Sequence, residues 1–338
     1  MNRLRLALAA TTLLMTVSVG AAELKIATLA PERSGWVQEM RKGAREIRER
    51  TDGRVVMKFY VGGSQGNDKQ VLRAIRTRRL HGGAFTPMSL QDRYADVNIY
   101  GLPFLFESEK EVDYVRGRMD RKLLQGLEEA GFISFGFTNG GFVFLMSNEP
   151  VRGLDDLKGK RVWVPEGDRI SYATVEALDL SPVTLPLTDV LTGLQTGLID
   201  IVLFPPIGTL ALQWHTKVKY LTEMPILFSM GLMAIDATAF GRLSEGDQQI
   251  VREVMAGIYE DFSNVNREDN KNAKEALLNS GVQSVQPTAG ELEKIHEIME
   301  RTNRQLGEQG LFSMALYDEM IGHIDDYRRQ QQEAGGGS

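Results

Sequence analysis

The segment from Ser244 to Ser280 constrains the fold more than any other part of the chain. Its first half carries apolar residues at three- and four-residue spacing, which predicts an amphipathic helix; they are Ile250, Val254, Ile258 and Phe262. Residues 266–272 are polar on every face. One continuous helix here would be about 54 Å long, more than the width of a small domain. A polar middle is typical of a helix that bridges two domains. The alternative is two helices with an unmarked break.

Strand and helix patterns alternate in the rest of the chain, which favours α/β layers with a largely parallel sheet. The expected strands are Leu24–Thr28, Val55–Tyr60, Gly82–Thr86, Phe132–Phe137, Phe142–Met146, Arg161–Val164, Ile199–Phe204 and Leu232–Ile235. Residues Thr138–Gly141 are predicted to form a turn between two of these strands. A second α/β unit is expected to begin after Pro150, and Leu232–Ile235 could lead the chain back to the first unit.

The two ends of the chain indicate an exported protein. Residues 1–22 resemble a secretory signal peptide, with Arg3 and Arg5 ahead of an apolar run and small residues at the end. The chain has no cysteine, so neither a lipoprotein anchor nor a disulfide can form. The mature protein is expected in the periplasm. Its last residues, 331–338, are expected to be disordered.

Composition narrows the class of protein. The formal net charge is −6 and no basic block occurs, so nucleic acid is not an expected partner. With 42% hydrophobic and 25% charged residues the chain has an ordinary globular composition. At 338 residues, two domains are expected, because single cores rarely grow beyond about 250–300 residues.

Several sequence motifs resemble those of a known family. They are LDDLKGKRVWVP (154–165), LQTGLID (194–200), IVLFPP (201–206), ERTDGRVVMKFYVGG (49–63) and LPFLF (102–106). Together they resemble TRAP-type (tripartite ATP-independent periplasmic) solute-binding proteins. The resemblance implies two α/β lobes joined by crossing strands and one long inter-lobe helix. It also implies a ligand cleft between the lobes, no catalysis, and delivery of the solute to TRAP membrane permease subunits driven by an ion gradient.

Combining the patterns with the resemblance gives expected domain boundaries. The first lobe takes residues 23–141 with about 231–272, and the second lobe takes residues 142–230 with about 273–330. The words VWVPEGD and ALQWHTKVKYLT resemble the branch that works with an additional helical-repeat periplasmic lipoprotein, which is therefore an expected partner.

The ligand positions that the family implies are unusual in this chain. Where the family keeps a strand arginine two residues before VP, this sequence has Trp163. A second arginine position aligns with Val143, after Phe142, and an asparagine position aligns with Phe204. Bidentate arginine is the usual partner of a carboxylate, and burying a carboxylate without a partner costs several kcal/mol. The substitutions therefore predict a hydrophobic solute, lipid-like or aromatic.

The predicted ligand-binding residues share an apolar or aromatic side chain near the expected cleft. They are Trp163, Phe204, Val143 and Phe142, with Phe85, Met88 and Trp36 added because they follow strand ends, where open α/β sheets bind ligands. Glu166 and Asp168 follow the VP turn, and both are candidates to cap the helix that begins near Ile170. One alternative keeps the receptor but gives it a carboxylated ligand, held by a relocated cation or by backbone amides.

Other classes of function remain as alternatives. Gly62–Gly66 matches the G-x-S-x-G nucleophile elbow, so a serine hydrolase at Ser64 is the enzymatic alternative. An adaptor that binds protein would show an exposed apolar patch and no enclosed cavity. His296 with Glu297 is only half of a zinc motif, so no metal site is predicted. No cofactor is predicted either.

Overall fold

The computed structural model describes residues 21–335, apart from the side chains of residues 263–265. The predicted signal peptide thus lies outside the described residues except for Ala21 and Ala22. Ala22 is the first residue of strand β1, and its N–H donates to the Arg54 carbonyl at 2.7 Å. Cleavage after Ala22 would leave this strand to begin at Glu23. No helix among residues 21–335 is both long enough and apolar enough to cross a bilayer.

Strands and helices alternate as the sequence predicts. The strands are β1 (Ala22–Ala27), β2 (Val55–Tyr60), β3 (Gly82–Phe85), β4 (Phe132–Ile133), β5 (Thr138–Ser147), β6 (Arg161–Pro165), β7 (Ser181–Leu185), β8 (Ile201–Phe204), β9 (Tyr220–Asp236) and β10 (Gln283–Val285). The helices are α1 (Gly35–Arg50), α2 (Asp68–Arg76), α3 (Glu109–Glu129), α4 (Leu154–Leu157), α5 (Arg169–Ala177), α6 (Val190–Thr196), α7 (Pro206–Ala211), α8 (Ala237–Phe240), α9 (Glu245–Asn279), α10 (Glu291–Glu308) and α11 (Met314–Gly335).

The strands form two sheets that share β9. The order is β2-β1-β3-β9-β5-β8-β6-β7, with β4 and β10 also paired to β9. The outer strands pair in parallel, as in β1 with β2 and β6 with β7. Strand β9 runs from one sheet into the other and pairs antiparallel with β5; these two are the crossing strands. The predicted largely parallel sheet is therefore correct only for the two outer parts, and the centre is antiparallel.

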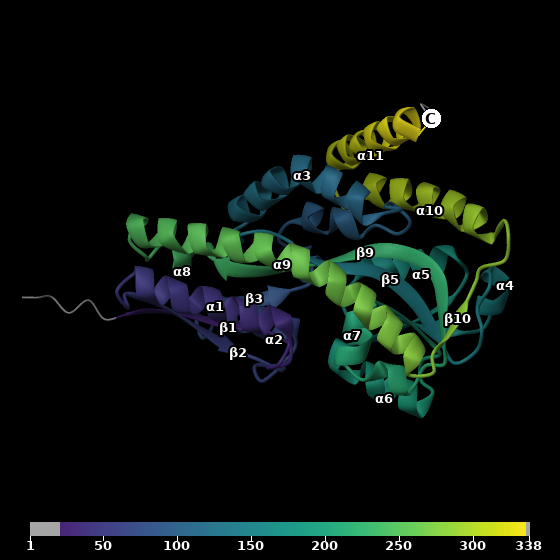
Figure 1. Cartoon of the computed structure of the whole chain (residues 1–338), viewed down its shortest axis with the longest axis horizontal. Coiled ribbons are helices and arrows are strands. Elements are labelled where there is room, and N and C mark those ends of the chain that lie inside the picture. Colours follow the sequence, from purple (N-terminus) through teal and green to yellow (C-terminus); the bar gives the residue numbers. More distant parts are fainter. Residues whose placement is uncertain (1–20, 336–338) are drawn as a thin grey trace, which may run out of the picture.

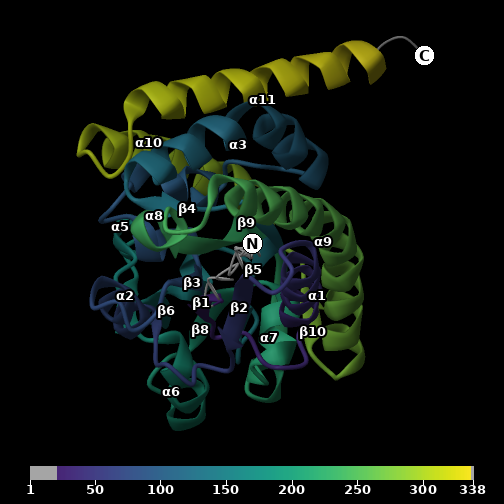
Figure 2. The same cartoon turned by 90° about the vertical axis from the view of Figure 1, so that its left-hand side faces the viewer.

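Helices cover both faces of each sheet, which gives two α/β lobes (Figures 1 and 2). In the first lobe, α1 and the first half of α9 pack on one face, and α2 and α3 on the other. In the second lobe, α5 and α10 cover one face, while α6, α7 and the end of α9 cover the other. The predicted two-lobe fold with crossing strands is confirmed.

Helix α9 is continuous over 35 residues, so the predicted single helix is confirmed and the broken helix is wrong. Figure 1 shows it running beside both lobes. Its polar middle is only partly exposed, because Asn266 and Asn270 are buried against the crossing strands. The Asn266 amide donates to the Asn139 carbonyl at 2.6 Å. The polar stretch therefore contacts β5 through buried asparagines and is not simply a solvent-exposed segment between the lobes.

The predicted turn at Thr138–Gly141 is wrong, because these residues begin β5. Gly140 and Gly141 allow β5 to approach β9 and α9 closely. A Cβ on Gly140 would lie 2.9 Å from the Ser229 carbonyl oxygen of β9. Gly141 has a φ of +86°, and a Cβ there would lie 2.7 Å from the Asn270 side chain. The strand expected at Phe132–Phe137 is correspondingly short and ends at Ile133.

The C-terminal helix differs from its predicted extent. Helix α11 continues through residues 331–335, which were expected to be disordered. It packs along α3, as Figure 2 shows. Lys122 pairs with Glu319, the Tyr114 ring lies tilted against that of Tyr327, and Gln330 donates to the Tyr114 hydroxyl at 3.0 Å. Arg328 donates to the buried Glu111 at 2.7 Å. Residues 336–338 lie outside the described part of the chain.

Candidate functional site

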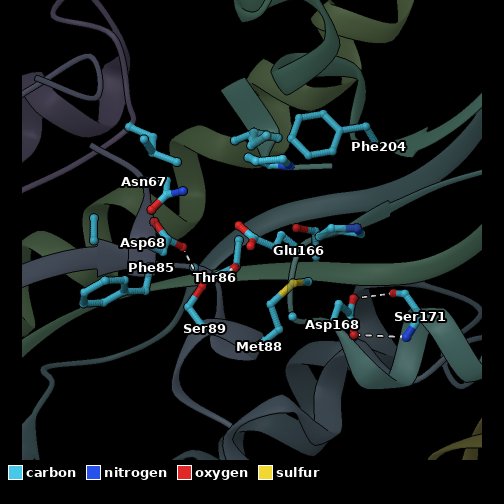
Figure 3. Close-up of a pocket in the computed structure, with 18 of the residues that line it drawn as sticks. Asn67, Asp68, Phe85, Thr86, Met88, Ser89, Glu166, Asp168, Ser171 and Phe204 are labelled. Atoms are coloured by element: carbon cyan, nitrogen blue, oxygen red, sulfur yellow. Dashed lines mark hydrogen bonds between the residues drawn. The ribbon is translucent and has the colours of Figure 1, made fainter. Parts of the chain in front are cut away.

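A cavity of about 440 Å³ lies between the two lobes (Figure 3). The first lobe contributes the loop after β1, the start of α2, the end of β3 and the residues that follow it. The second lobe contributes β6, the start of α5 and the end of β8. The crossing strands β5 and β9 form the wall between them. The cavity thus opens beyond the carboxyl ends of β1, β3, β6 and β8, where open α/β sheets place their ligands.

Six of the seven predicted ligand residues line this cavity. They are Trp36, Phe85, Met88, Val143, Trp163 and Phe204. Trp36 follows β1, Phe85 ends β3, and Trp163 and Phe204 lie on β6 and β8. Residues that are far apart in the sequence therefore meet, because the ends of neighbouring strands lie at one edge of each sheet.

Phe142 does not line the cavity. Successive side chains on a strand point to opposite faces, and Val143 already faces the cavity from β5. The Phe142 ring instead packs edge to face on Phe228, with centroids 5.1 Å apart. The prediction that Phe142 contributes to the cavity wall is therefore wrong.

Trp163 belongs to an aromatic cluster at the cavity wall. Its ring centroid lies 5.9 Å from that of Phe204 and 5.2 Å from that of Trp214, and Phe204 and Trp214 are 4.6 Å apart. The indole N–H donates to the Leu185 carbonyl at 3.0 Å. Since Trp163 is only 2% exposed and its one donor is already used, it presents a small apolar surface to the cavity and no polar group.

Two of the carboxyl groups that line the cavity are held by serine side chains. Asp68, the first residue of α2, accepts from the Ser89 hydroxyl at 2.5 Å. Asp168 caps α5 as predicted, since it accepts from the Ser171 N–H at 3.0 Å and from the Ser171 hydroxyl. Figure 3 draws both pairs with dashed lines. Burial raises the pKa of Asp68 and the pKa of Asp168, and the serine hydrogen bonds oppose the increase.

Lys69 is the only lysine or arginine among the described residues that line the cavity. Its ammonium lies 2.7 Å from the Glu166 carboxylate, which belongs to the second lobe. The Gln91 amide donates to the Gly167 carbonyl and makes a second contact between the lobes. Four acidic residues line the same cavity, namely Asp68, Asp92, Glu166 and Asp168. The lining therefore has more acidic than basic side chains.

The Lys69–Glu166 pair is expected to hold the lobes together more than it stabilises the fold. Because both side chains are partly exposed, Lys69→Gln or Glu166→Gln should lower the free energy of unfolding by at most about 1 kcal/mol. The radius of gyration, measured by small-angle X-ray scattering, should increase at low salt. Lys58→Gln is the matched control, because Lys58 pairs with Glu23 within one sheet at 3.7 Å. An unchanged radius in both cleft variants would contradict this role.

Sequence reasoning missed several cavity residues. Asp68 and Lys69 sit at the start of α2, and Thr138 and Ser229 lie on the crossing strands. Asp68 and Lys69 could have been found from the sequence, because Asn67 caps α2 and marks a helix start directly after a strand and turn. No local sequence pattern marks Thr138 and Ser229, because their positions depend on how β5 and β9 cross.

The structure does not support catalytic or metal chemistry at the alternative sites. Ser64 is exposed in the turn between β2 and α2, and its side chain makes no hydrogen bond within the described residues. His296 packs against the Phe104 ring, with centroids 5.0 Å apart. Among the described residues, no group of three or more histidine, aspartate or glutamate side chains is placed to hold a metal ion.

Two α/β lobes around a cavity and joined by crossing strands define a two-lobe binding protein. The family model described as bacterial extracellular solute-binding protein, family 7, matches residues 26–309, so the chain belongs to this family. The resemblance to TRAP-type solute-binding proteins is thereby confirmed at the level of the family. This family and its structural neighbours are solute-binding proteins and not enzymes.

Curated relatives are distant. An uncharacterized protein from Haemophilus influenzae is 25% identical, and the match spans 64% of this chain and 65% of that protein. YiiZ from Salmonella typhimurium is 24% identical over 46% of this chain and 48% of its own length. The C4-dicarboxylate-binding periplasmic protein DctP from Rhodobacter capsulatus is 23% identical over 71% of this chain and 74% of the relative.

Solved structures share the fold. A TRAP periplasmic solute-binding protein from Desulfovibrio salexigens with bound orotic acid has a TM-score of 0.81 and 22% identity, covering 90% of this chain and 99% of that one. The sugar-acid-binding protein DctPAm from Advenella mimigardefordensis, in complex with galactonate, has a TM-score of 0.83 and 18% identity, covering 90% and 98%. The ligands of both proteins are acids.

Proposed function

We propose that this protein is the periplasmic receptor of a TRAP-type transporter and that it closes around a hydrophobic, lipid-like or aromatic solute. The solute is released to the membrane permease subunits of the transporter. A helical-repeat periplasmic lipoprotein is a further proposed partner. The first lobe comprises residues 23–141 with about 231–272, and the second comprises residues 142–230 with about 273–330, except that α11 packs on α3 of the first lobe.

One observation carries the hydrophobic assignment. Trp163, which stands where the family keeps a carboxylate-binding arginine, lies at the cavity wall with its N–H bound to Leu185. Phe204 and Val143 extend the same wall, and neither offers a polar side-chain group. An apolar ligand gains about 25 cal/mol for each Å² of surface that it buries on such a wall.

Charge in the cavity supports the same assignment. A carboxylate taken from water needs a cation or several hydrogen-bond donors, because burying it unpaired costs several kcal/mol. No arginine lines the cavity among the described residues, and Lys69 is paired with Glu166. The lining carboxyl groups would also repel an anionic ligand.

A carboxylated ligand is the second candidate. The similar proteins of known structure contain orotic acid and galactonate, which favours an acidic solute here. Lys69 is the relocated cation that this candidate requires, and it would have to exchange Glu166 for the ligand. The adaptor alternative is disfavoured, because an inter-lobe cavity exists and the large hydrophobic side chains exposed among the described residues are Tyr172 and Leu198.

Ligand binding distinguishes the two candidates. Organic extracts of gently purified protein, analysed by mass spectrometry, should contain a co-purified apolar compound. In isothermal titration calorimetry, 1-decanol should bind with a negative heat-capacity change, as burial of apolar surface predicts. Orotate and D-galacturonate should give no measurable heat. Micromolar binding of either acid, together with no binding of 1-decanol, would contradict the proposal and favour the second candidate.

A further inference from the structure

A small side cavity adjoins the main one. It has a volume of about 60 Å³, room for a group of a few non-hydrogen atoms. Thr86, Met88, Asp168 and Ser229 line both cavities, so the two share a wall. We call this space the annex. A ligand whose body fills the main cavity could place one end in it.

Polar side chains without protein partners face the annex. Asn98 is 7% exposed, and its amide makes no hydrogen bond to any described residue. The Ser229 hydroxyl is also without a protein partner within residues 21–335. Buried polar groups are nearly always hydrogen-bonded, so the buried Asn98 amide indicates a place where a polar ligand group binds, and the half-buried Ser229 hydroxyl lines the same space.

The charges around the annex restrict the kind of group that fits. Asp168 is buried at the annex, and no lysine, arginine or histidine lines it among the described residues. An anionic group would therefore meet a carboxylate and no cation. The Asp168 oxygens already accept from the Ser171 N–H and hydroxyl. A cationic group would thus form a buried ion pair, whose desolvation roughly offsets its attraction.

We propose that the annex binds an uncharged hydrogen-bonding head group, a hydroxyl or a carboxamide, of the hydrophobic ligand. Asn98 and Ser229 form the hydrogen bonds, and the apolar body lies against Trp163 and Phe204 in the main cavity. The solute is therefore a neutral amphipathic molecule. This inference rests on the proposed function and specifies its ligand class.

Three probes with the same alkyl chain test the head group. 1-Decanol, decanoate and decylamine are titrated into the full mature protein by isothermal titration calorimetry. 1-Decanol should bind at least about 10-fold more tightly than either charged probe. Asn98→Leu and Ser229→Ala should each weaken 1-decanol binding about 5- to 10-fold, as expected for loss of a hydrogen bond. The second variant removes one atom only, so it tests the annex even if Asn98→Leu fails to fold.

Ser134→Ala is the matched control, because it removes a hydroxyl as Ser229→Ala does. Ser134 is 8% exposed, donates to the Gly136 carbonyl at 3.2 Å, and lines neither the main cavity nor the annex. It should leave the order of the three probes unchanged. Equal binding of all three, or tighter binding of a charged probe, would overturn the head-group assignment and leave a hydrophobic-ligand receptor standing. Absence of binding by every probe would overturn the proposed function itself.

Discussion

Replacing Trp163 with alanine should lower the free energy of unfolding by about 3–5 kcal/mol, the usual range for a buried tryptophan. Trp163 is 2% exposed and packs on Phe204 and Trp214, so the substitution leaves a cavity in the second lobe. Urea denaturation followed by far-ultraviolet circular dichroism measures the change. The same variant should lose binding of 1-decanol, because the apolar wall of the ligand cavity is removed.

Trp163→Phe is the milder change at the same position. It keeps one aromatic ring but removes the other ring of the indole and the N–H that donates to the Leu185 carbonyl. The Leu185 carbonyl keeps its hydrogen bond from the Glu166 N–H at 3.2 Å, and a loss of about 1–2 kcal/mol is expected. If Trp163→Ala cost less than about 1 kcal/mol, the indole would not be a packed element of the wall as described.

Replacing Gly141 with alanine should lower the free energy of unfolding by about 2–4 kcal/mol. Gly141 has a φ of +86°, in the left-handed region. A residue with a Cβ is destabilised there by about 1–2 kcal/mol. The new Cβ would also lie 2.7 Å from the buried Asn270 side chain, and crowding of this kind costs about 1–3 kcal/mol. Thermal and urea denaturation measure the change.

Gly131→Ala is the control for backbone strain alone. Gly131 has a φ of +95°, and a Cβ there meets nothing within 4 Å. Its substitution should cost about 1–2 kcal/mol. The double variant Gly141→Ala with Asn270→Ala tests the contact, because it should recover part of the loss caused by crowding. Equal costs at the two glycines would show that Asn270 does not restrain the crossing strand.

Much of the architecture could be predicted because it depends on local patterns. The apolar stripe of α9 predicts a helix, and Ser244 and Gly281 mark its two ends. Trp163 could be placed because LDDLKG and VP flank its strand on both sides. Glu166 and Asp168 were the candidates to cap α5 because both follow the VP turn, and Asp168 is the residue that caps it.

Predictions failed where distant segments decide the local structure. Strand β9 spans 17 residues, although its pattern indicated only Leu232–Ile235, because its first part contains Glu223 and Pro225. Its pairing with β5 and β10 compensates for these weak strand formers. Phe142 was assigned to the cavity because a single sequence does not show which face of β5 points inward. Asn98 and Ser229 meet at the annex only after the lobes assemble.

The aromatic cluster makes the molecule its own optical probe. The chain has three tryptophans, and Trp36 and Trp163 line the ligand cavity while Trp214 lies 5.2 Å from Trp163. Solute entry would change the surroundings of two indoles directly and of the third through ring contact. Intrinsic fluorescence, without any attached dye, would therefore record the arrival of a ligand in real time.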